Sequence, residues 1–261
     1  MLPTDELTMG VTRGRDHRRA SGDAPRPRVY LSAALVTTAL AVVGFWPTYF
    51  GRIVSGSVGV PSVIHFHAAV FITWLMLFVV QVVFAATGRI RLHMRVGRWV
   101  MAYGLIVICA GLMAISEGFT TRLATGDVFR AQRWLFGTLR DLVFFAPFLA
   151  AGWIYRRYPE IHKRLMIVAT VILVLPAVSR MTFPGTPVPL WKFMLVWPVP
   201  VYIAMIHDFR TRKLVHPVYV IGIAAMLTMR LVLPIGSSQL WQTAASWITA
   251  IYETPISPVP H

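Results

Sequence analysis

Seven long apolar segments, separated by short basic connections, constrain this chain more than any single motif does. A helix needs about 20 mostly apolar residues to cross the hydrocarbon core of a bilayer. The hydrophobic fraction is 56% and the charged fraction only 13%, whereas soluble domains carry roughly 25% charged residues. We therefore predict an all-α fold, a polytopic membrane helix bundle with about seven transmembrane helices, at residues 29–50, 61–87, 96–117, 134–155, 161–183, 190–206 and 215–234. The sixth segment is the least regular, because it contains Pro198 and Pro200.

The basic residues predict the orientation of the bundle. The segment 1–28 and the connections 88–98, 156–164 and 207–216 contain 6, 4, 4 and 3 Lys and Arg residues, 17 of the 25 in the chain. With seven spans all four lie on one side, and the positive-inside rule makes that side the cytoplasm. The N-terminus is then cytoplasmic. Because the net charge of +15 is dispersed in this way, it favours membrane topology, and no nucleic-acid partner is expected.

Both ends of the chain are predicted to lie outside the seven-span domain, which covers residues 29–234. Residues 1–28 form a basic tail without an apolar run, which is typical of disorder and not of a cleaved signal peptide. Residues 235–261 combine an amphipathic stretch with a short C-terminal tail. We expect an amphipathic interfacial helix on the outer face, its tryptophans among the lipid headgroups. Its apolar positions at helical spacing are Leu240, Ala244, Trp247, Ile248 and Ile251.

The second predicted span carries polar side chains on one face. His67, Trp74 and Gln81 follow one another at intervals of seven residues, which on an α-helix are only about 20° out of alignment. His65 lies two residues before His67 and points to the other side. A helix in lipid does not need such a stripe, so we expect this face to meet neighbouring helices or a cavity.

The histidines are predicted to form two layers. His67 and His93 are 26 positions apart, which is roughly 39 Å of unbroken helix, whereas the hydrocarbon core is about 30 Å thick. No single metal ion can therefore bind both. His65 and His67 are candidate metal ligands in the outer layer. His207 and His216 flank a basic loop on the inner side, and we expect both to be solvated.

Charged residues are predicted to lie on the same side of the bundle as the outer histidines. Arg140 and Asp141 fall within the fourth span, and Arg180 lies near the outer end of the fifth. An Arg–Asp pair inside an apolar span is costly and usually marks a site or a pathway. The functional interpretation is a polar pocket for an anionic or redox group, with Asp141, His67, Arg140 and Arg180 as catalytic candidates. The alternative is an interhelical clamp that only stabilises the bundle.

His93 and His162 form the inner layer, each among basic residues at the start of a span. A neutral imidazole can bind haem iron or a transition metal, so both are candidate cofactor ligands, with haem b or a transition metal as the candidate cofactor. The alternative is a pair of interfacial residues beside arginines that bind lipid phosphates. The two basic elbows are 69 residues apart, which indicates either an internal duplication or convergence on the same topology signal.

Three sequence motifs carry a family resemblance: HFHAAVFITWLMLFVVQ, the elbow LHMRVGR, and RRYPEIHKRLM. Together they resemble a broad family of uncharacterised bacterial multi-pass membrane proteins, over roughly residues 61–182. The resemblance implies no particular activity. Met94 stands where a second basic residue is common in that family, which weakens an anion-binding role for the elbow. The residues that match the pattern are His67, Trp74, Gln81, His93, Arg140, Asp141, His162, Lys163, Arg164 and Arg180.

Several functions remain open from the sequence. The leading hypothesis is a bacterial inner-membrane protein whose buried histidines hold a haem or metal for electron transfer or redox-complex assembly. The alternatives are a cofactor-free transporter or channel lined by Asp141, a membrane enzyme acting on a lipid or isoprenoid with Asp141 as acid and His67 as base, and a stabilising subunit of a larger complex. The expected partners are membrane lipids and either another membrane protein or a second copy of the chain.

Overall fold

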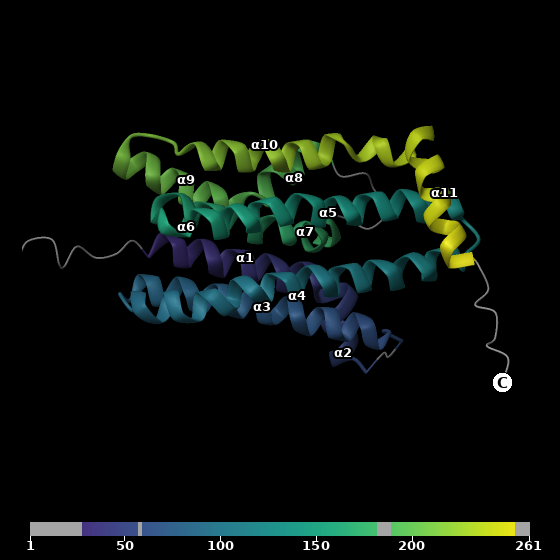
Figure 1. Ribbon diagram of the computed structural model, residues 1–261, viewed down its shortest axis with the longest axis horizontal. Helices are drawn as coiled ribbons and strands as arrows, with labels where there is room; N and C mark the ends of the chain where they lie inside the picture. Colours follow the sequence, from purple (N-terminus) through teal and green to yellow (C-terminus); the bar gives the residue numbers. More distant parts are fainter. Residues whose placement is uncertain (1–27, 57–58, 182–188, 254–261) are drawn as a thin grey trace, which may run out of the picture.

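The computed structural model describes residues 28–56, 59–181 and 189–253, and within these ranges the chain forms helices and no strand (Figure 1). The predicted tail up to residue 27 and the C-terminal tail from residue 254 lie outside the described residues. The helices are α1 (Val29–Phe45), η2 (Trp46–Phe50), α2 (Gly51–Val54), α3 (Ser62–Ala86), α4 (Ile90–Leu123), α5 (Val128–Ile154), η3 (Tyr155–Arg157), α6 (Pro159–Leu173), α7 (Leu175–Met181), α8 (Leu190–Val196), α9 (Val199–Arg212), α10 (Pro217–Leu231), η4 (Leu233–Ser237) and α11 (Gln239–Glu253).

The long apolar helices make the chain a multi-pass membrane protein. In the described ranges, five helical segments are long and apolar enough to cross a membrane, and the number rises to seven if each of two bent helix pairs is one span. The bent pairs are α6 with α7, at 47°, and α8 with α9, at 61°. Pro176 follows the first break and Pro198 lies in the second. Proline lacks an N–H and clashes with the preceding turn, so it bends a helix.

The two breaks are joined by a hydrogen bond. The indole Nε1 of Trp197, at the α8–α9 break, donates to the backbone carbonyl of Val171, near the end of α6, over 2.7 Å. Trp197 is fully buried. A helix broken inside a membrane is stable only where another group bonds the backbone that the break has freed. The carbonyl of Val171 also accepts from the N–H of Val174, so the Trp197 indole adds a second hydrogen bond beside the first break.

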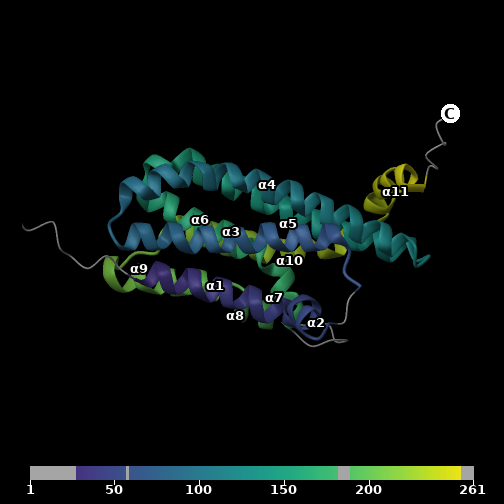
Figure 2. The same ribbon diagram turned by 90° about the horizontal axis from the view of Figure 1, so that it is seen from below.

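The bundle has two distinct ends. At the end that we call the basic end lie the turns 88–89, 155–158 and 213–216, together with the start of α1. At the opposite end, the α11 end, α11 lies across the tips of α4 and α5 (Figure 1). Seen from below, α1 and α9 form one side of the bundle and α4 the other (Figure 2).

The α4–α5 hairpin is longer than predicted. The third and fourth spans were expected at 96–117 and 134–155, whereas α4 has 34 residues and α5 has 27. At 1.5 Å per residue α4 is roughly 51 Å long, well beyond the hydrocarbon thickness of about 30 Å. Hydropathy locates the apolar part of a helix and not its ends, because a helix continues through charged residues once it reaches water.

The ends of α4 and α5 next to their connecting turn form the surface on which α11 packs. A second hydrophobic cluster forms around Phe119, Ala131 and Leu135, and Trp241 and Ile248 of α11 pack against it. The Trp241 indole donates to the Gln132 carbonyl over 2.8 Å. The expected amphipathic helix is present, but Trp241 and Ile248 face protein. The face of α11 that remains exposed carries Leu240, Trp247 and Ile251.

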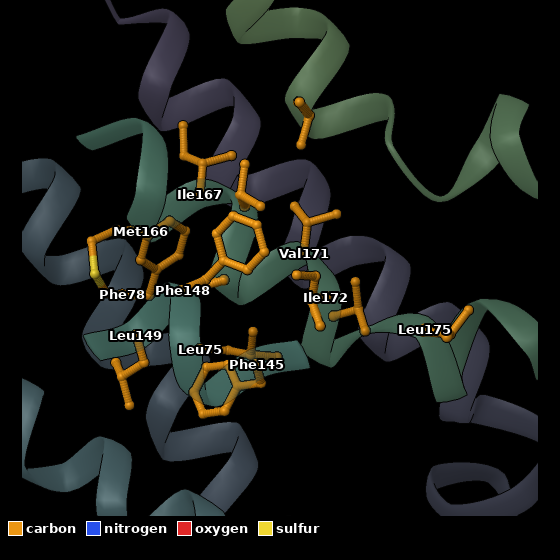
Figure 3. Packing of buried hydrophobic residues seen from close by; sticks show 14 of the residues in the cluster. Leu75, Phe78, Phe145, Phe148, Leu149, Met166, Ile167, Val171, Ile172 and Leu175 are labelled. Carbon is orange, nitrogen blue, oxygen red and sulfur yellow. The ribbon is translucent and has the colours of Figure 1, made fainter. Parts of the chain in front are cut away.

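The main core lies where α3, α5 and α6 meet, with Leu75, Phe78, Phe145, Phe148 and Met166 packed together (Figure 3). Small residues let some helices approach more closely. A Cβ placed on Gly44 of α1 would overlap the backbone carbonyl of Ala177 in α7. Close backbone approach at glycine is typical of helix pairs in membranes.

We expect Gly44→Ala to destabilise the protein by about 1–3 kcal/mol, because the added methyl group overlaps the backbone of α7. The measurement is the free energy of unfolding in mixed micelles titrated with a denaturing detergent. Gly137→Ala in α5 is the matched control, since the nearest atom to its Cβ is 3.9 Å away. That change should be neutral or gain up to about 1 kcal/mol of helix stability. Equal effects of the two substitutions would contradict the close α1–α7 contact.

Candidate functional site: a histidine pair and two arginine centres

The structure brings the two predicted inner histidines together at the basic end. His93 lies in the first turn of α4 and His162 in the first turn of α6. The centres of their rings are 6.2 Å apart, in an edge-to-face arrangement. Both side chains are half-buried. Residues 69 positions apart in the sequence thus share one small volume between two helix hairpins.

Each histidine is fixed by a backbone carbonyl of the preceding helix. His93 Nδ1 lies 3.1 Å from the carbonyl oxygen of Gln81, and His162 Nδ1 lies 2.8 Å from that of Gly152. A carbonyl oxygen only accepts hydrogen bonds, so Nδ1 carries the proton in both rings. In a neutral imidazole this leaves the lone pair on Nε2. The two hairpins repeat the same contact, as their similar elbow sequences suggest.

The polar stripe of α3 faces inward. Trp74 is fully buried and Gln81 is 7% exposed. In the part of the chain that the structure describes, neither Trp74 Nε1 nor the amide N and O of Gln81 has a hydrogen-bond partner. The Gln81 amide oxygen would lie 3.3 Å from a Cβ on Gly97, one turn after His93 on α4. A buried amide without partners therefore adjoins the histidine pair.

The two predicted outer histidines have different surroundings. His65 is exposed, and its Nδ1 lies 3.0 Å from the hydroxyl of Tyr49. His67 is half-buried, its ring is stacked parallel to Phe71, and its buried Nδ1 has no partner among the described residues. No group of three or more His, Cys, Asp or Glu residues in the described ranges could hold a metal ion. The charge of Arg180 acts on His67.

Arg140 and Asp141 form a buried ion pair in α5. The Nε and Nη2 atoms of Arg140 donate to one carboxylate oxygen of Asp141, over 3.1 and 2.6 Å. Its Nη1 donates to the carbonyl oxygen of Met229 in α10, over 2.6 Å. The pair therefore ties α5 to α10, as the predicted interhelical clamp would.

Arg180 does not bond Asp141 directly. Its Nη1 donates to the carbonyl oxygen of Pro176 over 2.6 Å, and its guanidinium lies 4.9 Å from the ring centre of Phe45. Its charge nevertheless acts on both Asp141 and His67. The four predicted catalytic candidates thus share one electrostatic neighbourhood, although only Arg140 and Asp141 are in contact.

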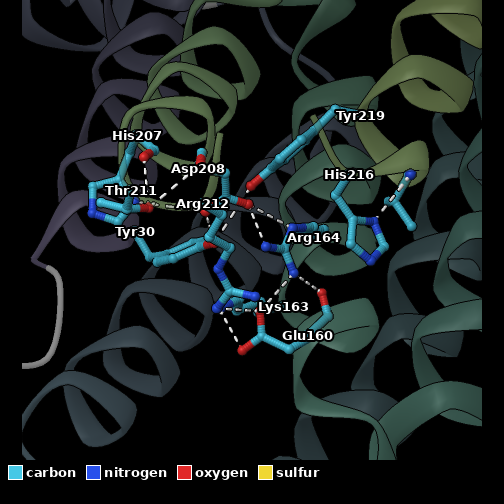
Figure 4. A network of polar contacts seen from close by, with 11 residues as sticks. Tyr30, Glu160, Lys163, Arg164, His207, Asp208, Thr211, Arg212, His216 and Tyr219 are labelled. Atoms are coloured by element: carbon cyan, nitrogen blue, oxygen red, sulfur yellow. Dashed lines mark hydrogen bonds and ion pairs between the residues drawn. The ribbon is translucent and has the colours of Figure 1, made fainter. Parts of the chain in front are cut away.

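A second buried charge centre at the basic end was not predicted from the sequence (Figure 4). Arg164 of α6 is fully buried and Asp208 of α9 is 2% exposed. Arg164 donates through Nε to Asp208 over 2.8 Å, and through Nη2 to the same carboxylate oxygen. The Tyr30 hydroxyl donates to Asp208 over 3.2 Å and lies 3.4 Å from the hydroxyl of Tyr219. Helices α1, α6, α9 and α10 therefore meet at one carboxylate.

Two sequence signals could have located this centre. Arg164 belongs to the motif HKRLM, and Asp208 is the only acidic residue in the basic connection 207–216. Glu160 extends the network, because it accepts from Lys163 over 2.9 Å and pairs with Arg212 at 2.7 Å. Lys163, Arg164 and Arg212 each pair with a carboxylate, so we interpret this network as a structural link between helices.

The histidines of the 207–216 connection contribute to this tie. His207 was expected to be solvated, but its ring packs edge-on against Tyr30 and its Nδ1 lies 3.6 Å from Asp208. His216 accepts from the backbone N–H of Val218 through Nδ1 over 3.3 Å and so caps α10. Partial burial lowers the pKa of His216, and the positive charge of Arg164 lowers it further. The neutral form that can act as a cap is thereby favoured.

The fold and the apolar helices together define a multi-pass integral membrane protein. Comparison of the chain with protein-family models, with curated proteins and with solved structures gives no match. What the polar centres can do must therefore be inferred from the chemistry of their own residues.

We expect Asp208→Asn to destabilise the protein by roughly 3–5 kcal/mol, because it leaves the Arg164 guanidinium buried without its counter-charge. The readout is again the free energy of unfolding in mixed micelles. Asp127→Asn is the control, since Asp127 pairs with the largely exposed Arg130 at 3.3 Å and asparagine also caps a helix. The control should change stability by less than about 1 kcal/mol. A loss of similar size in both variants would mean that the buried pair does not hold the helices together.

Proposed function

We propose that this membrane protein holds a transition-metal centre between His93 and His162, and that the centre serves electron transfer or the assembly of a redox complex. The observation that carries the proposal is the facing pair of imidazoles with both Nδ1 atoms bonded to backbone carbonyls. Metal-binding histidines almost always donate their second ring N–H to a carbonyl or carboxylate in this way. The interaction sets the tautomer and aims Nε2 at the metal.

The separation of the rings also supports a shared metal. A metal–imidazole bond is about 2 Å long, so two imidazoles on opposite sides of one metal have ring centres roughly 6 Å apart. The observed separation is 6.2 Å. His93 and His162 also come from different hairpins, so a common ligand would bind the two hairpins together.

Two imidazoles suit either of two metal centres. Histidine is a ligand of haem iron and imidazole also suits copper, so His93 and His162 could hold either a haem or a copper ion. Basic residues that are close to the two histidines in the sequence could pair with the propionates of a haem: Arg89, Arg91, Arg95, Arg156 and Arg157. The unpartnered amide of Gln81 would gain a hydrogen-bond partner from a bound group.

The distribution of basic residues also supports a membrane location and an orientation. We propose that the protein lies in the bacterial inner membrane with its basic end in the cytoplasm, because most of its Lys and Arg residues belong to that end. The family resemblance of residues 61–182 supports the bacterial assignment. A metal centre at His93 and His162 would then lie near the cytoplasmic surface, within reach of a soluble electron donor or chaperone.

We expect the full-length protein, purified in detergent, to carry haem or a metal, or to bind added haemin or Cu(I) at one equivalent per chain. His93→Ala and His162→Ala should each lower occupancy or affinity at least about tenfold, since even outer-shell partners of a metal contribute 10- to 100-fold. The measurements are the Soret absorption, metal analysis by mass spectrometry, and titration. A Soret band identifies haem, and copper without a Soret band identifies an ion.

His65→Ala is the control for this experiment, because His65 is exposed at the opposite end of α3. It should leave binding unchanged. The proposal fails if the wild-type protein binds neither haemin nor a metal ion, or if His65→Ala abolishes binding while His93→Ala does not.

A further inference from the structure

We infer that Arg140, Arg180 and Arg230 form a binding site for a phosphate or carboxylate group towards the α11 end of the bundle. These three residues, which we call the arginine cluster, come from α5, α7 and α10. The histidine pair lies at the other end. The two proposals are therefore independent, and either can fail without the other.

The arginine cluster carries more positive charge than its neighbours neutralise. The charges of all three arginines act on Asp141, and Arg140 already holds that carboxylate with two hydrogen bonds. In residues 28–56, 59–181 and 189–253, no ion pair joins Arg180 or Arg230 to a carboxylate. The segment 182–188, which follows α7, contains no Asp or Glu.

This excess charge is costly where it lies. Arg122, at the end of α4, adds its repulsion to Arg180. Three guanidinium groups therefore act on the carboxylate of Asp141, and a fourth, that of Arg122, repels Arg180. Unmatched cations at this depth are unfavourable, and an anion bound among them would remove most of the cost. A negatively charged ligand would therefore stabilise the folded protein as well as bind to it.

Two buried nitrogen atoms near the cluster have no hydrogen-bond partner among the described residues. One is Nε of Arg230, whose guanidinium lies 3.9 Å from the ring centre of Phe193. The other is Nδ1 of His67, on which Arg180 acts electrostatically. A buried donor without an acceptor loses its hydration without compensation. An oxyanion accepts hydrogen bonds, so it would supply the acceptor that the buried N–H of Arg230 lacks.

The three arginines are graded in exposure. Arg180 is exposed, Arg230 is half-buried and Arg140 is 8% exposed. Arg180 is held by Pro176 and Phe45, and Arg140 by Asp141 and Met229. An anion can therefore reach Arg180 first and meet guanidinium groups whose positions are already set.

The chemistry selects phosphate or carboxylate. A guanidinium has a planar fork of N–H donors that matches two oxygens of either group. Such a group could belong to the headgroup of an anionic lipid, because Arg180 is exposed at the end of a helix pair apolar enough to span a membrane, or to a free anion from the aqueous side. The shared ligand is an oxyanion, and the experiment separates the two sources.

The experiment uses the full-length protein in nanodiscs of phosphatidylcholine. The thermal unfolding temperature is measured against inorganic phosphate in one arm and against the fraction of phosphatidylglycerol in the other. Native mass spectrometry identifies any phospholipid that remains bound. We expect stabilisation in at least one arm, with the responding arm naming the source. Arg230→Gln and Arg180→Gln should each weaken the response about tenfold, the effect of losing one charge-assisted hydrogen bond.

Two further variants make the test specific. Arg230→Lys keeps the positive charge but loses the planar set of guanidinium donors. If charge dominates binding, Arg230→Lys should weaken the response less than Arg230→Gln does. If the two-point contact dominates, the two substitutions should weaken it equally. Arg130→Gln is the control, because Arg130 is exposed on the same helix as Arg140 and pairs with Asp127. The inference is overturned if the wild-type protein responds in neither arm, or if Arg130→Gln weakens the response as much as Arg180→Gln does.

Discussion

A charge inside a bilayer has no water to hydrate it, so other groups of the protein must supply its partners. Two buried ion pairs in the described ranges obey that constraint. Arg164 and Asp208 join α6 to α9, with tyrosines of α1 and α10 bound to the same network. Arg140 bonds Asp141 beside it and reaches across to Met229 of α10. Each pair lies towards a different end of the bundle, so the helices are tied together at two levels.

The constraint also separates structural from functional polar groups. In the Arg164 network, Lys163, Arg164 and Arg212 each pair with a carboxylate, and the hydrogen bonds of the network link four helices. Six side chains in the described ranges have buried polar atoms without a hydrogen-bond partner: His67, Trp74, Gln81, Thr170, His207 and Arg230. Native proteins leave few such atoms unpaired. Gln81 adjoins the histidine pair and Arg230 belongs to the arginine cluster, so each proposed site contains one such group.

Much of the fold and part of the candidate site could be predicted because membrane helices follow simple periodicity. The spacing of His67, Trp74 and Gln81 predicted an inward face, and Trp74 and Gln81 are indeed buried. Helix ends were predicted poorly, since α4 and α5 continue past their apolar segments into water. Asp208 was missed because a residue in a basic connection was expected to be solvated, whereas α9 continues to Arg212 and buries the carboxylate of Asp208 against Arg164 of α6.

The sequence by itself determined the class of protein, the approximate spans and the two layers of histidines, because these depend only on local hydropathy and on the fixed rise of a helix. Only the tertiary structure decided which polar residues meet. His93 faces His162, and Arg230 joins Arg140 and Arg180, because separate hairpins pack side by side. Packing partners depend on the shapes of whole helix surfaces, and no local pattern in the sequence records them.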